Sequence, residues 1–357
     1  MQAVILVGGL GTRLRPLTWH TPKALVPVLN RPFLEHALLR LKSHGVGEVV
    51  LAISNLADEV ERCLGDGSYL GMKISYAHEK TAQGTAGAVK NAAELIKGTF
   101  FVLNGDIFTD LDYTAMLDFH RHRQASVTIA LTPVEDPTQY GLVETTPEGR
   151  VKRFLEKPGW NEITTNMINA GTYVMEPEVL DLIPSAMEYS FERQLFPEML
   201  AGDKAVFAFP SAGYWIDIGS PAKYRQLNFD LLTGRSGGCG DEVITGEGSN
   251  IAATAVIRGP VLIGRGCDIG ERVLVEGPAV IGANCRIAGD AVVSSAIVWD
   301  GVAIGDSCRV SASIIANGCR LEAGSRVEGA VLGDHVRVNH DFAIYAGESI
   351  EPGTGIG

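Results

Sequence analysis

Short apolar runs alternate with longer segments of helical periodicity along the first two thirds of the chain. The runs are rich in β-formers: Val4–Val7, Glu48–Ile53, Lys73–Tyr76, Phe100–Leu103 and Ser126–Leu131. Helical spacing marks the segments between them: Phe33–His44, Leu56–Leu64, Thr85–Ile96 and Tyr113–Arg123. This alternation predicts an α/β fold with a mostly parallel sheet covered on both faces. Ligands of such sheets bind beyond the carboxyl ends of the strands, so residues at those ends are the candidates for function.

From residue 251 the pattern changes to one aliphatic residue every six positions. The first series is Ile251, Ile257, Ile263, Ile269, Val275, Ile281, Ile287 and Val293. It continues in steps of six, with every third step shortened to five, through Val298, Ile304, Val310, Ile315, Leu321, Val327, Leu332 and Val338. A second, mostly small residue follows each aliphatic of the first series by four positions, as Cys267 and Cys285 do. This is the hexapeptide β-helix pattern of a triangular solenoid. It is similar to hexapeptide-repeat proteins, and that resemblance implies a left-handed parallel β-helix.

Composition divides the chain at the same place. Of 42 glycines, 23 lie from Gly234 onward, whereas only three of the 25 aromatic residues do. We therefore expect a catalytic domain over residues 1–233, a glycine-rich linker over 234–250 and a β-helix domain over 251–357.

Charge and cysteine content exclude several classes of protein. The net charge of −12 argues against binding to nucleic acid or to an anionic membrane surface. No apolar run approaches the roughly 20 residues of a membrane span, and the N-terminus lacks a basic leader, so we expect a cytoplasmic protein. None of the six cysteines forms a C-x-x-C pair, which leaves zinc and redox motifs unsupported. Four of them, Cys267, Cys285, Cys308 and Cys319, fall on small inward positions of the coil and are expected to be core residues.

A glycine-rich, basic loop follows the first expected strand. It reads Gly8-Gly9-Leu10-Gly11-Thr12-Arg13-Leu14-Arg15-Pro16-Leu17-Thr18. Glycines there let backbone N–H groups wrap a phosphate, whose charge Arg13 can neutralise. A dinucleotide fingerprint would need glycine at Leu14, and a Walker A loop would need a Gly-Lys pair, which the chain lacks. Both common phosphate motifs are therefore excluded.

This loop, followed by Pro22-Lys23, resembles the signature of the sugar-1-phosphate nucleotidyltransferases. The resemblance implies a Rossmann-like domain that joins a nucleoside triphosphate to a sugar 1-phosphate and releases pyrophosphate. It implies that Arg13 and Lys23 hold the triphosphate and are catalytic together with Asp106. The nucleotide-binding residues expected from it are Gly8, Gly9, Gly11, Thr12, Arg13, Lys23, Gln83, Gly84 and Thr85.

Two carboxylates are candidates for a metal site. Asp106 follows the expected strand Phe100–Leu103, and a carboxylate at that edge suits Mg²⁺, a hard cation that prefers oxygen ligands. Asp217 lies in an apolar stretch, where an acid is costly unless it is paired or metal-bound, and the resemblance makes it the second ligand. Asp110 and Asp112 form a competing D-x-D pair further past the strand.

The sugar 1-phosphate is assigned to the next motifs by the same resemblance. Gly141, Glu156 and Asn169 would face the sugar hydroxyls, and Lys157 would face the sugar phosphate. The loop, the Tyr140–Val143 segment and the motif beginning at Phe191 are most similar to the mannose-1-phosphate guanylyltransferase group. That group implies GTP and mannose 1-phosphate as substrates.

Alternatives remain at this stage. Gln83 stands where the guanylyltransferases usually have leucine, which leaves thymidylyl or uridylyl transfer to glucose 1-phosphate open. A non-catalytic regulatory subunit is a second alternative, although Arg13, Lys23, Asp106 and Asp217 are all present. The coil carries no motif for acetyl-CoA chemistry, which disfavours an acyltransferase function for it. We expect it instead to build a homo-oligomer through outward apolar residues: Val280, Val292, Trp299 and Ile314.

Overall fold

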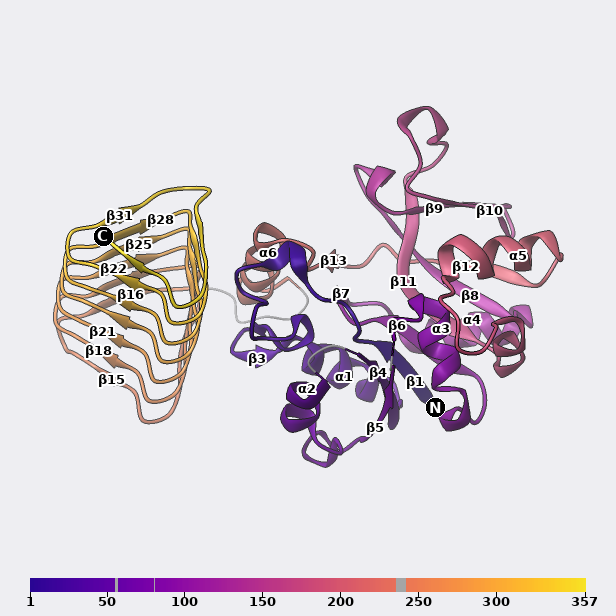
Figure 1. Cartoon of the computed structure of the whole chain (residues 1–357), viewed down its shortest axis with the longest axis horizontal. Coiled ribbons are helices and arrows are strands. Elements are labelled where there is room, and N and C mark those ends of the chain that lie inside the picture. The colour runs from indigo at the N-terminus through magenta and orange to yellow at the C-terminus, as the bar shows by residue number, and fades with distance from the viewer. Residues whose placement is uncertain (55–56, 80, 236–241) are drawn as a thin grey trace. The chain divides into compact units, whose positions relative to one another are not determined.

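The computed structural model describes residues 1–54, 57–79, 81–235 and 242–357 (Figure 1). The chain divides into two compact units. We call Met1–Gly9 with Leu34–Asp217 the sheet unit, and Leu10–Phe33 with Ile218–Gly357 the coil unit. Residues 236–241 of the expected linker, with Cys239, lie outside the described residues.

The sheet unit contains a nine-stranded sheet whose first half is parallel, in the order β6-β1-β4-β5. These strands are β1 (Gln2–Leu6), β4 (Glu48–Ile53), β5 (Lys73–His78) and β6 (Phe100–Asn104). The helices are α1 (Phe33–Ser43), α2 (Ala57–Leu64), α3 (Gly84–Asn91), α4 (Tyr113–Arg123) and α5 (Phe196–Ala201). Consecutive residues such as Val4 and Ile5, whose side chains point to opposite faces of the sheet, are both fully buried. The strands read as continuous apolar runs because both faces of the sheet are covered.

The second half of this sheet is mainly antiparallel, since β11 runs against β6, β8 and β9. Its strands are β8 (Val127–Pro133), β9 (Gly141–Thr145), β10 (Val151–Glu156), β11 (Met167–Met175) and β12 (Val206–Pro210). A separate two-stranded ladder joins β7 (Ile107–Thr109) to β13 (Trp215–Asp217). The expected α/β class is confirmed, with a mixed sheet.

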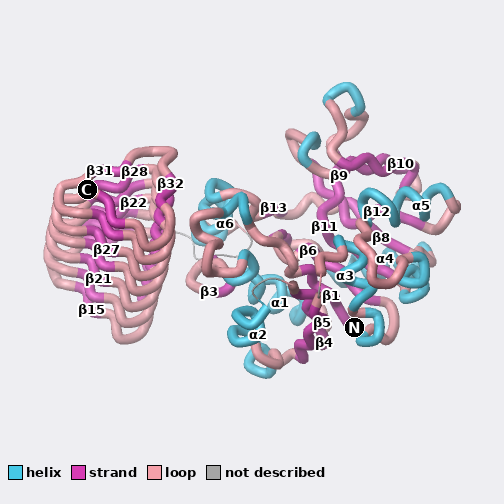
Figure 2. Tube along the Cα trace, viewed as in Figure 1, coloured by secondary structure: helices cyan, strands magenta, loops and turns pink. Residues whose placement is uncertain are grey.

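The C-terminal coil consists of short parallel strands in three sheets, joined by tight turns (Figure 2). The first sheet is β14 (Val243–Thr245), β17 (Val261–Ile263), β20 (Ala279–Ile281), β23 (Ile297–Val298), β26 (Ile314–Ile315), β29 (Val331–Leu332) and β32 (Ser349–Ile350). The second is β15 (Asn250–Ile251), β18 (Asp268–Ile269), β21 (Arg286–Ile287), β24 (Ala303–Ile304), β27 (Arg320–Leu321), β30 (Arg337–Val338) and β33 (Gly355–Ile356). The third is β16 (Val256–Arg258), β19 (Leu274–Glu276), β22 (Val292–Ser294), β25 (Arg309–Ser311), β28 (Arg326–Glu328) and β31 (Ala343–Ile344).

The core of the coil follows the hexad pattern. Aliphatic residues spaced six apart, such as Ile263, Ile269 and Val275, are at most 1% exposed. Cys267, Cys285, Cys308 and Cys319 are buried free thiols, as expected of core residues. The coil begins earlier than expected, because β14 lies within residues 234–250 and pairs with β17.

The coil unit also contains the N-terminal segment Leu10–Phe33 and the helix α6 (Pro221–Leu232). Ser220 caps α6 by accepting a hydrogen bond from the Lys223 N–H, and Pro221 occupies its first turn. Tyr224 is fully buried, and its hydroxyl donates to the carbonyl of Pro27 in β2 (Pro27–Val28), which pairs with β3 (Arg31–Pro32).

Trp299 of the coil meets this helix. Its indole N–H donates to the Tyr224 hydroxyl over 2.9 Å, and the two rings pack edge to face. Further contacts join the same elements: Asn30 donates to the Ile281 carbonyl at 2.8 Å, and Arg225 donates to the Ala312 carbonyl. The segment Leu10–Phe33 is thus held by α6 and by the coil.

These contacts correct one expectation about the coil surface. Val280, Trp299 and Ile314 were expected on an outward face free for another subunit, but they are only 1–2% exposed within this chain. Val280, Ile297 and Ile314 stand in register on adjacent turns of the first sheet. Trp299 follows that sheet and packs on α6, so the chain's own helix takes part in covering the apolar face. Val292 is half-buried.

No helix among the described residues is long and apolar enough to span a membrane.

The Trp299 contact should dominate the stability of the coil unit. Replacing Trp299 by alanine should lower the free energy of unfolding by about 3–5 kcal/mol, because a buried indole is lost and a cavity remains. Trp160 is 71% exposed, so Trp160→Ala should change it by no more than about 0.5 kcal/mol. Urea unfolding followed by circular dichroism compares the two variants. Equal unfolding midpoints would show that Trp299 does not anchor α6.

Candidate functional site

The candidate site lies at the carboxyl edge of the two central parallel strands. Register pairs Leu6 of β1 with Asn104 of β6, so Gly8-Gly9 and Asp106 leave the sheet at the same edge. The turn after β6 is tight, since Gly105 N–H donates to the Leu6 carbonyl at 2.9 Å. A Cβ at Gly105 would lie 2.5 Å from that carbonyl oxygen, so only glycine fits.

Asp106 and Asp217 come together through the β7–β13 ladder. Asp217 pairs with Ile107, the residue that follows Asp106, although the two acids are far apart in the sequence. The Tyr140 hydroxyl donates to Asp217 Oδ2 at 3.1 Å. Within the described ranges no group of three or more His, Cys, Asp or Glu side chains is arranged to hold a metal. Two carboxylates nevertheless fit Mg²⁺, which commonly takes one or two protein carboxylates and completes its shell with phosphate oxygens and water.

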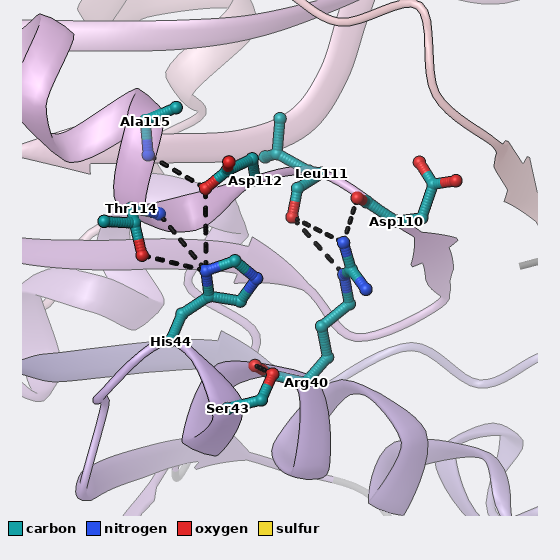
Figure 3. Close-up of polar contacts among 8 residues, drawn as sticks. All are labelled: Arg40, Ser43, His44, Asp110, Leu111, Asp112, Thr114 and Ala115. Carbon is teal, nitrogen blue, oxygen red and sulfur yellow. Dashed lines mark hydrogen bonds and ion pairs between the residues drawn. The ribbon is translucent and has the colours of Figure 1, made fainter. Parts of the chain in front are cut away.

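The competing pair Asp110 and Asp112 does not form a chelate (Figure 3). Asp112 caps α4 by accepting from the Ala115 N–H at 2.9 Å, and the same oxygen lies 3.6 Å from Nδ1 of His44. The Asp110 carboxylate points away from Asp112 and lies against Gly213, whose Cβ would fall 1.9 Å from Oδ1. Arg40 binds the backbone carbonyls of Asp110 and Leu111. These acids therefore shape the loop before α4.

The glycine-rich loop crosses the boundary between the two units, with Gly8 and Gly9 in the sheet unit and Leu10–Thr18 in the coil unit. In the sheet unit, the Gly8 carbonyl accepts from the Ser54 hydroxyl at 3.0 Å. In the coil unit, Thr12–Leu14 and Lys23–Leu25 each form one turn of 3₁₀ helix. The Gly11 carbonyl accepts from the Thr18 hydroxyl at 2.8 Å, which closes the loop behind Arg13.

Within the coil unit, Arg13 and Lys23 border two glycines. The Arg13 guanidinium lies 3.4 Å from the position of a Cβ at Gly219, and Lys23 Cβ lies 3.2 Å from that of Gly11. Gly219 is the second residue after Asp217. Glycine at positions 11 and 219 therefore leaves space for the stem of Lys23 and for the Arg13 guanidinium.

Gln83 is the N-cap of α3, and Gly84 and Thr85 begin its first turn. Gly84 has a φ of +71°, and a Cβ there would lie 2.7 Å from the Tyr189 carbonyl oxygen. Glu79 Oε1 accepts from the Gln83 N–H at 3.2 Å, and burial raises the pKa of this carboxyl. Glycine is therefore required at Gly84 by the close packing of this turn against the Tyr189 backbone, and Glu79 fixes the Gln83 N–H beside it.

The residues expected to bind sugar lie on β9, β10 and β11. Gly141 pairs with Glu156, and a Cβ at Gly141 would lie 3.1 Å from Glu156 Oε2. Burial raises the pKa of Glu156, and the nearby Glu192 raises it further, although Lys157 and Arg193 act in the opposite direction. The Lys157 N–H donates to the Tyr140 carbonyl at 3.0 Å, with Lys157 in the left-handed region at a φ of 50°.

Asn169 is held at both ends of its side chain. Its Nδ2 donates to the Tyr173 hydroxyl at 2.7 Å, and its Oδ1 accepts from the Gly171 N–H at 3.0 Å. One N–H of the amide remains for a ligand, because the NH₂ group carries two donors.

Sequence reasoning missed several residues that shape this site. Trp215 donates to the Ala170 carbonyl at 3.0 Å and packs edge to face on Tyr140, which binds Asp217. Tyr140 precedes Gly141 in the sequence, and Trp215 lies two residues before Asp217. This closeness to expected site residues could have identified both aromatics. Glu192 was used only as part of a family marker, and the sequence gives no sign of its contacts across the sheet.

A cavity of about 670 Å³ lies at the opposite, amino edge of the strands. It is lined by residues such as Gln2, Glu48, Lys73 and Lys97, and by none of the residues expected to bind substrates. Ligands of α/β sheets bind at the carboxyl edge, which favours the site described above.

Two family models match successive parts of the chain. The family model described as Nucleotidyl transferase matches residues 2–234, and the model described as EIF2B subunit epsilon LbH domain matches residues 241–344. The second match agrees with a left-handed β-helix.

Two of the curated relatives are named as mannose-1-phosphate guanylyltransferases. The chain is 36% identical over 330 residues to mannose-1-phosphate guanylyltransferase of Mycobacterium tuberculosis, which covers 92% of this chain and 83% of that protein. It is 42% identical over 239 residues to mannose-1-phosphate guanylyltransferase catalytic subunit beta of Xenopus tropicalis. That match spans 66% of this chain and 63% of the frog protein, less than two thirds of its length.

Solved structures resemble the N-terminal part. HddC from Yersinia pseudotuberculosis, complexed with GMP-PN, is 30% identical with a TM-score of 0.56, covering 64% of this chain and 97% of HddC. A putative glucose-1-phosphate thymidylyltransferase from Bacillus anthracis is 24% identical with a TM-score of 0.58, covering 64% of this chain and 94% of that one. The latter likeness shows the fold alone.

The raised pKa of Glu156 predicts a pH-dependent gain in stability from Glu156→Gln. Ionised Glu156 opposes folding because of burial and Glu192, and this cost is present above its folded pKa and vanishes below its unfolded pKa. The variant should melt higher than the native protein at pH 8, and the difference should shrink toward pH 4.

Exposed Glu148 provides the control. Hydrogen bonds with the Thr146 side chain and with its own backbone lower the pKa of Glu148, so Glu148→Gln should lower the melting temperature slightly at pH 8. Thermal melts at both pH values measure the two effects. A Glu156→Gln variant that melts lower at pH 8 would show that this carboxylate is stabilised where it lies.

Proposed function

The chain belongs to the nucleotidyl transferase family, and from that premise we propose that it transfers a guanylyl group from GTP to mannose 1-phosphate. The products are GDP-mannose and pyrophosphate. One observation carries the proposal: the likeness to the mycobacterial mannose-1-phosphate guanylyltransferase extends over 92% of this chain, through both the catalytic domain and the coil.

The proposed reaction is a direct displacement at phosphorus. A phosphate oxygen of mannose 1-phosphate attacks the α-phosphorus of GTP in line, the new O–Pα bond forms, and the bond to the β-phosphate oxygen breaks. No general base is needed because the attacking phosphate monoester is already anionic at pH 7. The protein's work is alignment and charge neutralisation, which account for most catalysis of this type.

Arg13 and Lys23 would neutralise the triphosphate, and the N–H groups of the glycine loop would hold its oxygens. Asp106 and Asp217 would hold Mg²⁺, which when bound supplies further positive charge at the phosphates. The Tyr140 hydroxyl keeps the Asp217 carboxylate oriented for that purpose.

The remaining motifs would place the two substrates. The base would lie against Gln83, Gly84 and Thr85 at the start of α3. Gly141, Glu156 and Asn169 would face the mannose hydroxyls, and Lys157 the sugar phosphate. A Cβ at Gly141 would lie 2.6 Å from the Phe154 ring and 3.1 Å from Glu156 Oε2, so only glycine lets β9 pass this close to them.

The alternatives from the sequence are weaker. The curated relatives are named for guanylyl transfer to mannose 1-phosphate, which disfavours thymidylyl or uridylyl transfer to glucose 1-phosphate despite Gln83. The reading as a non-catalytic regulatory subunit is disfavoured by the relative named as a catalytic subunit and by the presence of both acids and both cations.

The protein is further proposed to act in the cytoplasm as a homo-oligomer through its coil. Exposed apolar residues at the two ends of the coil support an oligomer. Val243, Ile244 and Val256 on the first turn and Tyr345 near the last are exposed. A second copy stacked on either end would cover such unpaired strand edges.

A substrate panel tests the proposed function. GTP, ATP, UTP and dTTP are each paired with mannose 1-phosphate and with glucose 1-phosphate, and pyrophosphate release is measured in the presence of Mg²⁺. GTP with mannose 1-phosphate should give the highest kcat/KM, and excess EDTA should abolish release.

Faster release with dTTP or UTP and glucose 1-phosphate would establish the alternative. No release with any pair would revive the regulatory reading.

A further inference from the structure

Glu192 lies where the proposed nucleotide subsite and sugar subsite meet. It is held from its own segment first: the Ser190 hydroxyl donates to Glu192 Oε2 at 2.7 Å and accepts from the Glu192 and Arg193 N–H groups. Ser190 thereby caps the short π-helical turn Phe191–Leu195. These contacts within its own segment fix the direction of the Glu192 carboxylate.

On the nucleotide side, the same oxygen binds the start of α3. The Thr85 hydroxyl donates to Glu192 Oε2 at 3.0 Å and accepts from the Phe191 N–H at 2.9 Å. Backbone bonds run in parallel, from Tyr189 N–H to the Gln83 carbonyl and from the Ala86 N–H to the Tyr189 carbonyl. The segment that carries Glu192 is thus fastened to the turn proposed to bind the base.

On the sugar side, the other oxygen acts through Tyr173. The Tyr173 hydroxyl donates to Glu192 Oε1 at 3.4 Å and accepts from Asn169 Nδ2 at 2.7 Å. Burial and the Glu192 charge raise the pKa of Tyr173 well above its ordinary value, so this hydroxyl remains a donor. The Asn169 amide is therefore linked to Glu192 through Tyr173, while the Gly171 N–H holds its oxygen.

The Glu192 charge also reaches Glu156, whose pKa it raises. Two of the residues expected at the sugar, Asn169 and Glu156, therefore respond to Glu192, one by hydrogen bonds and one by charge. Its remaining partner, Thr85, belongs to the nucleotide subsite.

We propose that Glu192 is a positioning residue that couples the two subsites, so that occupancy of one raises the affinity of the other. This inference rests on the proposed function for the identity of the two ligands. A ligand that presses on the start of α3 changes the Thr85 bond, and Glu192 transmits the change through Tyr173 to Asn169. Coupling of this kind is reciprocal, so each ligand must change the affinity of the other by the same factor.

Calorimetric titration measures the coupling without turnover. The ligands are mannose 1-phosphate and a GTP analogue with a methylene bridge between the α- and β-phosphates, which cannot release pyrophosphate. With Mg²⁺ present, the native protein should bind each ligand at least about five-fold more tightly when the other is saturating. In Glu192→Gln this factor should fall to near one, because the amide removes the charge and offers Thr85 and Tyr173 a weaker acceptor.

Glu198→Gln is the matched control. Glu198 accepts from the Tyr189 hydroxyl in the same region but is not part of the chain of contacts from Thr85 to Asn169. The control should keep the native coupling factor even if its melting temperature falls. Thr85→Val removes the hydrogen bond to Glu192 on the nucleotide side, and Tyr173→Phe removes the one on the sugar side. Each variant should reduce the coupling factor, which keeps the inference testable if Glu192→Gln fails to fold.

The outcomes separate this inference from the proposed function. A native protein that binds both ligands independently, or a Glu192→Gln variant with the native factor, would overturn the coupling role. A native protein that binds neither the GTP analogue nor mannose 1-phosphate would overturn the proposed function. The coupling would then be measured with the pair found by the substrate panel, where a factor that depends on Glu192 would still support it.

Discussion

Parallel pairing of β1 with β4 on one side and β6 on the other is the constraint on which the sheet unit depends. It fixes a single carboxyl edge at which the glycine loop, Asp106 and the β7–β13 ladder all begin. The register then leaves little choice of residue, since the close approach of Gly105 to the Leu6 carbonyl admits no side chain. Asp106 and Asp217, the acids proposed to hold the metal, become neighbours through the β7–β13 ladder although they lie far apart in the sequence.

The antiparallel half of the sheet carries the residues expected to bind the sugar. Strands β9, β10 and β11 bring Gly141, Glu156 and Asn169 to the region where β13 presents Asp217, and Tyr140 binds Asp217 directly. Glu192 then joins this half to the start of α3. Burying an acid such as Glu156 lowers the stability of the fold. Such destabilising groups are typical of sites where a polar ligand needs fixed hydrogen-bond acceptors. The coil unit contributes differently, because Trp299 and Tyr224 hold the segment that contains Lys23.

The sequence was informative wherever one local rule decided the outcome. Buried parallel strands had to be apolar throughout, so β1, β4 and β6 were found, and the hexads gave the coil with its buried cysteines. Other features depended on distant partners. Trp299 was expected to be exposed because the residue that covers it, Tyr224, lies 75 positions earlier. The cap formed by Asp112 was readable as Asp before a helix, yet only the structure shows its carboxylate diverging from that of Asp110. The roles proposed for Arg13, Lys23 and the sugar-binding residues came from resemblance and stay predictions.

The central claim is that Asp106 and Asp217 hold one divalent cation at the carboxyl edge, and localised backbone cleavage tests it most directly. Fe²⁺ replaces Mg²⁺ in the presence of the methylene GTP analogue, and ascorbate with hydrogen peroxide generates radicals at the bound iron. The account predicts cuts beside Asp106 and beside Asp217, identified by mass spectrometry, that disappear in Asp106→Asn and persist in Asp112→Asn. Cuts centred on Asp110–Asp112, or cuts at Asp106 without cuts at Asp217, would contradict it.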